Sequence, residues 1–94
     1  MVVGTCRVEL HIPGVRSLKE KRSRLKPILS RLRREFNLAT AEVEHNDVWQ
    51  SAVIGLATVS NDAGLAHAVL EQAVRWIETH HPDVQIVDWG VELL

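Results

Sequence analysis

The chain has 94 residues, 46% of them apolar, and a formal net charge of −1. This length and composition exclude intrinsic disorder and favour a single domain over residues 1–94. The single cysteine, Cys6, excludes an internal disulfide, and no apolar run is long enough to span a membrane. Since residues 1–7 also lack the features of a signal peptide, we expect a cytoplasmic protein with no membrane partner.

The charges are distributed very unevenly along the chain. Residues 16–34 hold nine of the eleven Lys and Arg residues and one acid, Glu20, so this segment carries +8. The remaining residues hold two basic residues and eleven acids, and they carry −9. The nearly neutral total therefore conceals a basic segment within an acidic chain.

The first two predicted elements are a strand and the basic helix. Residues 2–12 alternate as a strand does, with Cys6 on the buried face. Ser17 and Glu20 have the spacing of a capping box at a helix start. Apolar residues then recur on one stripe of the helix: Leu18, Leu25, Ile28, Leu29, Leu32 and Phe36. Lys21 and Arg22 lie at the edges of this stripe, where we expect their charges to stay in water. Pro27 predicts a kink or an irregular first part.

Two strands, a helix and a last strand follow. Residues 39–45 alternate and predict an edge strand, with Glu42 and Glu44 on its wet face. Residues 48–59 form the most apolar strand, and both of its faces are largely apolar, as in a central strand. Ser60, Asn61 and Asp62 should cap a second helix over 62–80, and residues 84–93 should form the last strand.

The order strand, helix, strand, strand, helix, strand predicts a fold. Two split βαβ units with right-handed crossovers give a four-stranded antiparallel sheet with both helices on one face. This is the ferredoxin-like α+β sandwich. Its other face is open, and we expect it to expose Ile54 and Leu56.

Two stretches carry a resemblance to a known family. IPGVRSLKEKRSRLKPIL at 12–29 and AEVEHNDVWQSAVIGLATVSND at 41–62 resemble the YlxP-like bacterial family of small domains of unknown function. The resemblance covers essentially the whole chain. It implies a ferredoxin-like fold, a bacterial cytosolic protein and, in some bacteria, a gene neighbourhood of translation and ribosome-assembly factors. It brings no established catalytic residues.

The basic helix is the strongest functional feature of the sequence. Phosphate binding needs Lys and Arg spread along an accessible face, and this helix meets that need. The candidate RNA contacts on its outer side and flank are Arg16, Lys19, Arg24, Lys26, Arg31, Arg33 and Arg34. Two other interpretations stay open: a solvated face whose charges pair with acids of the same molecule, and docking onto an acidic protein.

The aromatic residues argue against reading of bases by the sheet. RNA-recognition-motif sheets stack bases on aromatics of their central strands. Here the wet side of residues 2–12 has none, and the chain has no Tyr. Any RNA should therefore contact the helix through its backbone. We interpret Trp49 and Trp89 as packing or interface residues, and Trp76 as the rim of the core.

The open sheet face supports a second hypothesis. An open apolar face usually meets a partner, often a second copy of the chain. We expect a homodimer whose interface includes Gln50, Ile54 and Leu56.

Nothing in the sequence predicts an enzyme, a metal site or a cofactor. The five histidines are not spaced like zinc ligands, and there is no GxxxxGK[ST] phosphate loop. Cys6 and His11 point to opposite faces of their strand, which excludes a simple catalytic pair.

Overall fold

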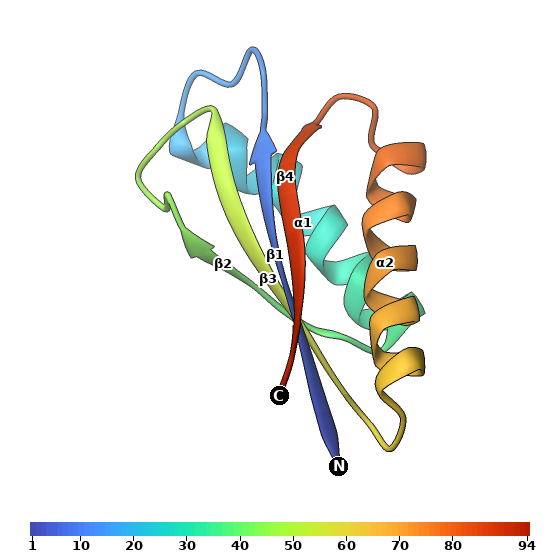
Figure 1. Cartoon of the computed structure of the whole chain (residues 1–94). Helices are drawn as coiled ribbons and strands as arrows, with labels where there is room; N and C mark the ends of the chain where they lie inside the picture. Colours follow the sequence, from blue (N-terminus) through green and yellow to red (C-terminus); the bar gives the residue numbers. More distant parts are fainter.

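The computed structural model describes residues 1–94 as one antiparallel sheet covered by two helices (Figure 1). The elements in chain order are β1 (Val2–His11), α1 (Leu18–Phe36), β2 (Ala39–Glu44), β3 (Ser51–Ser60), α2 (Ala63–His80) and β4 (Gln85–Leu93). The strands lie in the order β2-β3-β1-β4, and every neighbouring pair is antiparallel. This arrangement confirms the predicted ferredoxin-like fold. Neither helix is long and apolar enough to cross a membrane.

Local hydrogen bonds explain where α1 begins and ends. Ser17 Oγ accepts from the backbone N–H of Glu20 at 3.0 Å, and Glu20 Oε2 accepts from the N–H of Arg16 at 3.2 Å. The helix ends at Asn37, whose φ of 53° is left-handed. Between these ends α1 continues as one α-helix through Pro27. Pro27 and Ser23 are exposed, so the Ser23 carbonyl that loses its N–H donor can bind water.

Capping also explains the start of α2. Asp62 Oδ1 accepts from the backbone N–H of Leu65 at 3.0 Å, and Ser60 Oγ accepts from the N–H of Asp62 at 3.0 Å. The polar cluster at residues 60–62 therefore forms the N-cap that the sequence predicts.

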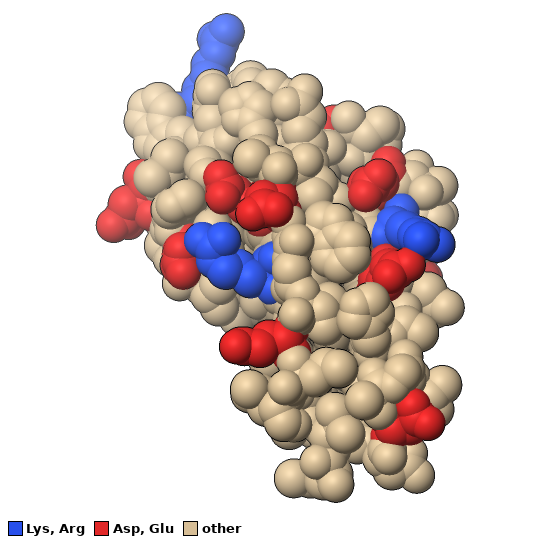
Figure 2. Space-filling model, viewed as in Figure 1, with Lys and Arg blue, Asp and Glu red and all other residues tan.

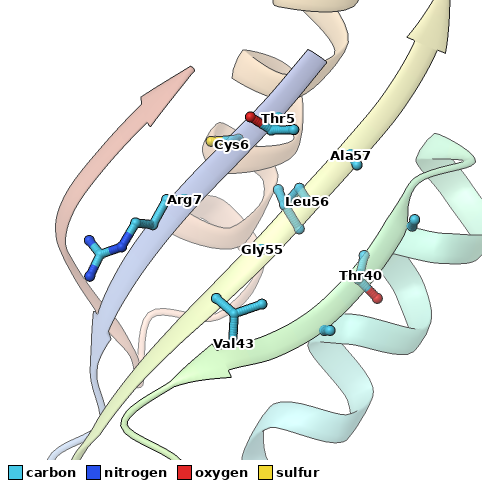
Figure 3. Close-up of a pocket in the computed structure, with 10 residues that line it drawn as sticks. Thr5, Cys6, Arg7, Thr40, Val43, Gly55, Leu56 and Ala57 are labelled. Carbon is cyan, nitrogen blue, oxygen red and sulfur yellow. The ribbon is translucent and has the colours of Figure 1, made fainter. Parts of the chain in front are cut away.

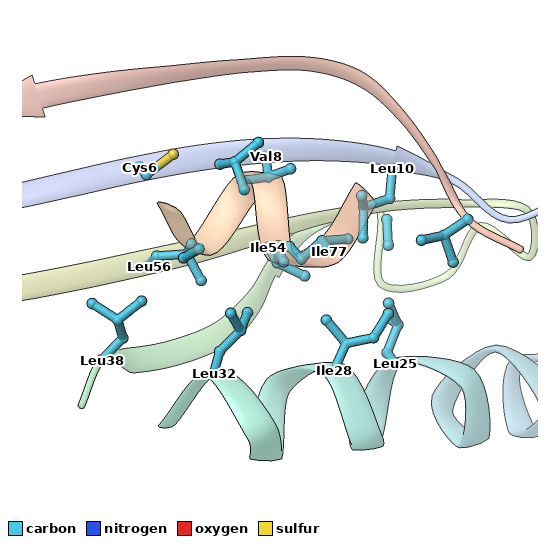
Figure 4. Packing of buried hydrophobic residues seen from close by; sticks show 14 of the residues in the cluster. Cys6, Val8, Leu10, Leu25, Ile28, Leu32, Leu38, Ile54, Leu56 and Ile77 are labelled. Atoms are coloured by element: carbon cyan, nitrogen blue, oxygen red, sulfur yellow. The ribbon is translucent and has the colours of Figure 1, made fainter. Parts of the chain in front are cut away.

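The core lies between the sheet and the two helices (Figure 4). β1 and β3 pair Cys6 with Leu56 and Val8 with Ile54, so these four side chains share the face that the helices cover. Ile54 and Leu56 have exposed fractions of 0% and 1%. The prediction that Ile54 and Leu56 are exposed on the open face is therefore wrong. Both faces of β3 are apolar, so its alternation does not reveal which face meets the helices.

A bulge in β2 separates two neighbouring acids. Glu42 pairs with Ile54, which places its side chain on the helix-covered face. The register shifts between Glu42 and Glu44, and Glu44 then pairs with Val53 on the opposite face. The predicted wet position is right for Glu44 and wrong for Glu42.

Lys21 is the partner that makes the inward position of Glu42 possible. The Lys21 side chain is fully buried, and its Nζ lies 2.7 Å from Glu42 Oε2. The same ammonium donates to the backbone carbonyls of His45 at 2.8 Å and Ser51 at 3.2 Å. A buried charge needs an opposite charge and hydrogen-bond acceptors to offset its loss of water. The expectation that Lys21 keeps its charge in water is therefore wrong, and Lys21 instead joins α1 to β2 and to the β2–β3 loop.

This buried pair predicts a large stability effect. Lys21→Met should lower the free energy of unfolding by about 3–5 kcal/mol, because it leaves the Glu42 carboxylate buried without a counter-charge. Lys26→Met makes the same chemical change at an exposed position of α1 and should cost less than about 0.5 kcal/mol. Urea denaturation of the two variants checks this. Similar small losses for both would contradict the description of Lys21 as a structural cation.

Candidate nucleic-acid interface

α1 presents its basic residues along two flanks, one beside α2 and the other beside β2. On the first flank, Arg31 lies with its guanidinium carbon 5.9 Å from the ring centre of Trp76 in α2. On the second flank, Arg33 Nη2 donates to the backbone carbonyl of Thr40 in β2 at 2.9 Å. The two flanks differ in how many of their charges are already paired.

The flank beside α2 is largely paired. Arg24 Nη1 lies 3.3 Å from Asp83 Oδ2, just beyond the end of α2. Arg31 Nη2 lies 2.6 Å from Glu35 Oε1, one helical turn further along α1. These pairs are exposed and each contributes about 1 kcal/mol or less, but the carboxylates lower the local positive potential. Arg24 and Arg31 are therefore weaker candidates for phosphate contact than the sequence predicts.

On the flank beside β2, no carboxylate pairs with the basic side chains, and the surface is hollowed. A groove of about 250 Å³ lies between α1 and β2. Its lining residues are Arg22, Leu25, Lys26, Leu29, Arg33 and Glu42. Glu42 is the only acid among them, and Lys21 already neutralises it. Arg22, Lys26 and Arg33 thus line a groove in which no carboxylate is left to compete for them.

Six exposed basic side chains of α1 and of Arg16, which precedes the N-cap Ser17, have no carboxylate within 4.0 Å. We call them the free cations: Arg16, Lys19, Arg22, Lys26, Arg33 and Arg34. From Lys19 to Arg34 they span about 22 Å of helix at about 1.5 Å per residue. Five of them are among the residues predicted from the sequence.

Arg22 is the free cation that the sequence analysis missed. The apolar pattern places Arg22, like Lys21, at the edge of the stripe. Its position, three residues after Lys19 and four before Lys26, puts it on the same flank as both, so helical spacing alone could have identified it.

The side of the molecule that faces the viewer in Figure 1, with β4 in front and α2 to its right, has a different electrostatic character. In the view of Figure 2 acidic side chains are spread over the surface, whereas Lys and Arg are few. Arg7 on this face is itself paired, with Nη2 at 2.7 Å from Glu44 Oε2. The hydrogen bond from Arg7 lowers the pKa of Glu44 and raises the pKa of Arg7, so both groups stay charged at neutral pH. The free cations are therefore concentrated on one side of the molecule.

The open sheet face also holds a shallow apolar groove of about 410 Å³ (Figure 3). The Val43 side chain lies over Gly55, where an added Cβ would be only 3.0 Å from Val43 Cγ1. The lining also includes the small residues Ala39, Ala41 and Ala57, and the polar residues Thr5, Arg7 and Thr40. Gln50, expected at an interface here, lies in the loop before β3, and its side-chain amide donates to the carbonyl of Val15 at 3.1 Å.

The surroundings of Cys6 and His81 indicate structural roles for both residues. Burial raises the pKa of the Cys6 thiol to about 11, so the thiol stays protonated at neutral pH. Burial also lowers the pKa of His81, whose ring packs edge-on against Trp76 at a centroid distance of 5.2 Å. No group of three or more His, Cys, Asp or Glu residues is placed to hold a metal ion.

Similar structures support the fold. The chain is similar to a de novo designed protein with a ferredoxin fold, with a TM-score of 0.62 at 8% identity over 100% of this chain and 84% of that one. It is also similar to a putative antibiotic biosynthesis monooxygenase from Deinococcus radiodurans, with a TM-score of 0.54 at 12% identity over 100% and 90% of the two chains. At these identities the likeness shows the fold alone.

Sequence comparison shows the family. The chain is 32% identical over 84 residues to a protein of Bacillus subtilis described as uncharacterized protein YlxP. The matched region covers 89% of this chain and 90% of that protein. Residues 3–91 match the family described as "Protein of unknown function (DUF503)". The resemblance seen in the sequence is confirmed, and the chain belongs to this YlxP-like family of bacterial proteins.

Proposed function

We propose that this protein is a non-enzymatic, cytoplasmic RNA-binding protein that contacts phosphates through the free cations of α1. The observation that carries the proposal is the set of six exposed cations that no carboxylate of the same molecule pairs. Each phosphate that such a residue neutralises releases counterions, which favours binding. A solvated face paired within the molecule would account for Arg24 and Arg31, but it leaves the free cations without a role.

The groove beside β2 gives the proposal its geometry. Arg22 and Lys26 lie one helical turn apart on its wall, and Arg33 lies two turns beyond Lys26. A sugar–phosphate backbone can follow such a row, because its charges also repeat at regular intervals. Leu25 and Leu29 also line the groove, and their apolar surface lowers the local dielectric constant and so strengthens the attraction.

A charge-reversal variant tests this proposal. Lys26→Glu/Arg33→Glu/Arg34→Glu should bind a fluorescein-labelled RNA hairpin with a single-stranded tail at least about 100-fold more weakly than the wild type. The reason is that each charge-assisted contact contributes about 1.5–3 kcal/mol. Fluorescence anisotropy at fixed salt measures both affinities.

A matched pair of single variants controls for net charge. Lys26→Glu and Arg75→Glu change the charge by the same amount, but Arg75 lies on α2 beside Glu71, at 2.7 Å. Lys26→Glu should weaken binding clearly more than Arg75→Glu. Equal affinities for the wild type and the triple variant would refute RNA binding through α1, and equal losses for the two single variants would indicate a nonspecific charge effect.

Self-association through the open sheet face is a second candidate function. The observation that favours it is the apolar groove around Gly55, together with the exposure of Val43 and Val59, whose exposed fractions are 52% and 66%. Face-to-face sheet packing would bury this surface against a second copy, with Ala41 and Ala57 in place of the residues first expected there. Such an interface is apolar and should respond little to salt, or strengthen with it.

Light scattering tests the dimer. The wild type should show the mass of two chains at high concentration, and Ala41→Arg should return it to one chain, because the new charge would be buried in the groove. Thr79→Arg on the exposed side of α2 is the control and should leave the mass unchanged. A wild type that is monomeric at every concentration would rule out this interface.

A further inference from the structure

Trp49 is the more exposed of two tryptophans, with Trp89, that neither the core nor the proposed phosphate contacts use. Its side chain lies in the loop between β2 and β3 and is 52% exposed. The aromatic contacts in the structure all involve Trp76, which packs against Phe36, His80 and His81. Trp49 has no ring stacked on it, so both faces of its indole are free of other aromatic side chains.

The loop that carries Trp49 is held firmly at several points. The buried Lys21 ammonium binds the carbonyls of His45 and Ser51, which stand on either side of the tip. The backbone N–H of Val48 donates to the carbonyl of His45 at 3.0 Å. The sequence alone suggests a packing or interface role for Trp49, but a large, half-exposed apolar ring on an anchored loop is also suited to binding.

The same anchors place Trp49 beside the basic end of α1. Its neighbour Gln50 donates to the carbonyl of Val15, the residue before Arg16. The N–H of Ile12 donates to the carbonyl of Gln50 at 2.9 Å. In Figure 1 the β2–β3 loop and the β1–α1 connection lie at the same end of the molecule. Trp49 is thus presented next to the segment that holds the first free cations: Arg16, Lys19 and Arg22.

We propose that Trp49 stacks on an unpaired base of the RNA whose phosphates contact the N-terminal part of α1. This inference rests on the proposed RNA binding and specifies its substrate as single-stranded RNA. A basic groove that follows the backbone, combined with an aromatic platform, is how proteins bind single strands without reading sequence. A duplex offers phosphates but keeps its bases stacked on one another, so Trp49 would contribute nothing to duplex binding.

The indole itself reports the contact. In Trp76→Phe/Trp89→Phe, Trp49 is the one remaining tryptophan, and in Trp49→Phe/Trp76→Phe the remaining one is Trp89 on β4. Circular dichroism checks that both variants are folded. A 12-nucleotide uridine-rich RNA should quench the fluorescence of the first variant and leave that of the second nearly unchanged.

Affinities of single variants in the otherwise native chain give an independent measurement. Trp49→Ala should weaken binding of the same RNA about 5- to 150-fold, because stacking contributes about 1–3 kcal/mol per base. Trp49→Phe should retain most of the affinity. Binding of a 12-base-pair duplex should be the same for the wild type and Trp49→Ala.

The outcomes separate this inference from the proposed function. If the RNA binds with strong salt dependence but Trp49 is not quenched and Trp49→Ala binds normally, stacking is refuted and phosphate binding by α1 stands. If the wild type binds no RNA, both proposals fall. If Trp49→Ala changes only the mass measured by light scattering, Trp49 belongs to an interface between copies and the stacking proposal is refuted.

Discussion

The buried ion pair between Lys21 and Glu42 is the interaction on which the rest of the account depends. Removing a lysine and a glutamate from water costs several kcal/mol per ion, and the cost is offset only by close pairing and further hydrogen bonds. Here the two charges lie 2.7 Å apart, and the ammonium donates its hydrogen bonds to the backbone carbonyls of His45 and Ser51, at the two ends of the β2–β3 connection. One side chain of α1 therefore fixes the edge strand β2 and the loop that carries Trp49.

This pair also determines which charges remain available at the surface. Glu42 is the only acid that lines the groove between α1 and β2, and Lys21 neutralises it from inside the protein. The cations on the outer side of the groove are left without a partner, while Asp83 and Glu35 engage the arginines on the other flank. The helix thus has one structural cation, two paired cations and five free ones, and Arg16 just before its N-cap is the sixth free cation. The uneven charge of the sequence becomes an accessible basic surface on α1, of which Arg22, Lys26 and Arg33 line the groove beside β2.

Local patterns were sufficient to predict the fold and the helix limits, but not the faces of the strands. The six elements follow from periodicity, and the cap at Ser17 follows from its spacing to Glu20. Ile54 was misplaced because both faces of β3 are apolar, and its face depends on pairing with Val8, 46 residues away. Glu42 was misplaced because a bulge and a lysine on another element decide its direction. Basic content predicted where to look for a site, whereas the tertiary ion pairs decided which residues could form it.

The salt dependence of RNA binding tests the central claim most directly, because it counts the cations that contact phosphates. If all six free cations take part, the logarithm of the affinity for a single strand should fall with the logarithm of salt concentration with a slope of about −4, at about −0.7 per contact. Lys26→Ala should make this slope less steep by about 0.7, and Arg31→Ala should leave it nearly unchanged. A slope near zero, or equal changes for these two variants, would contradict the account.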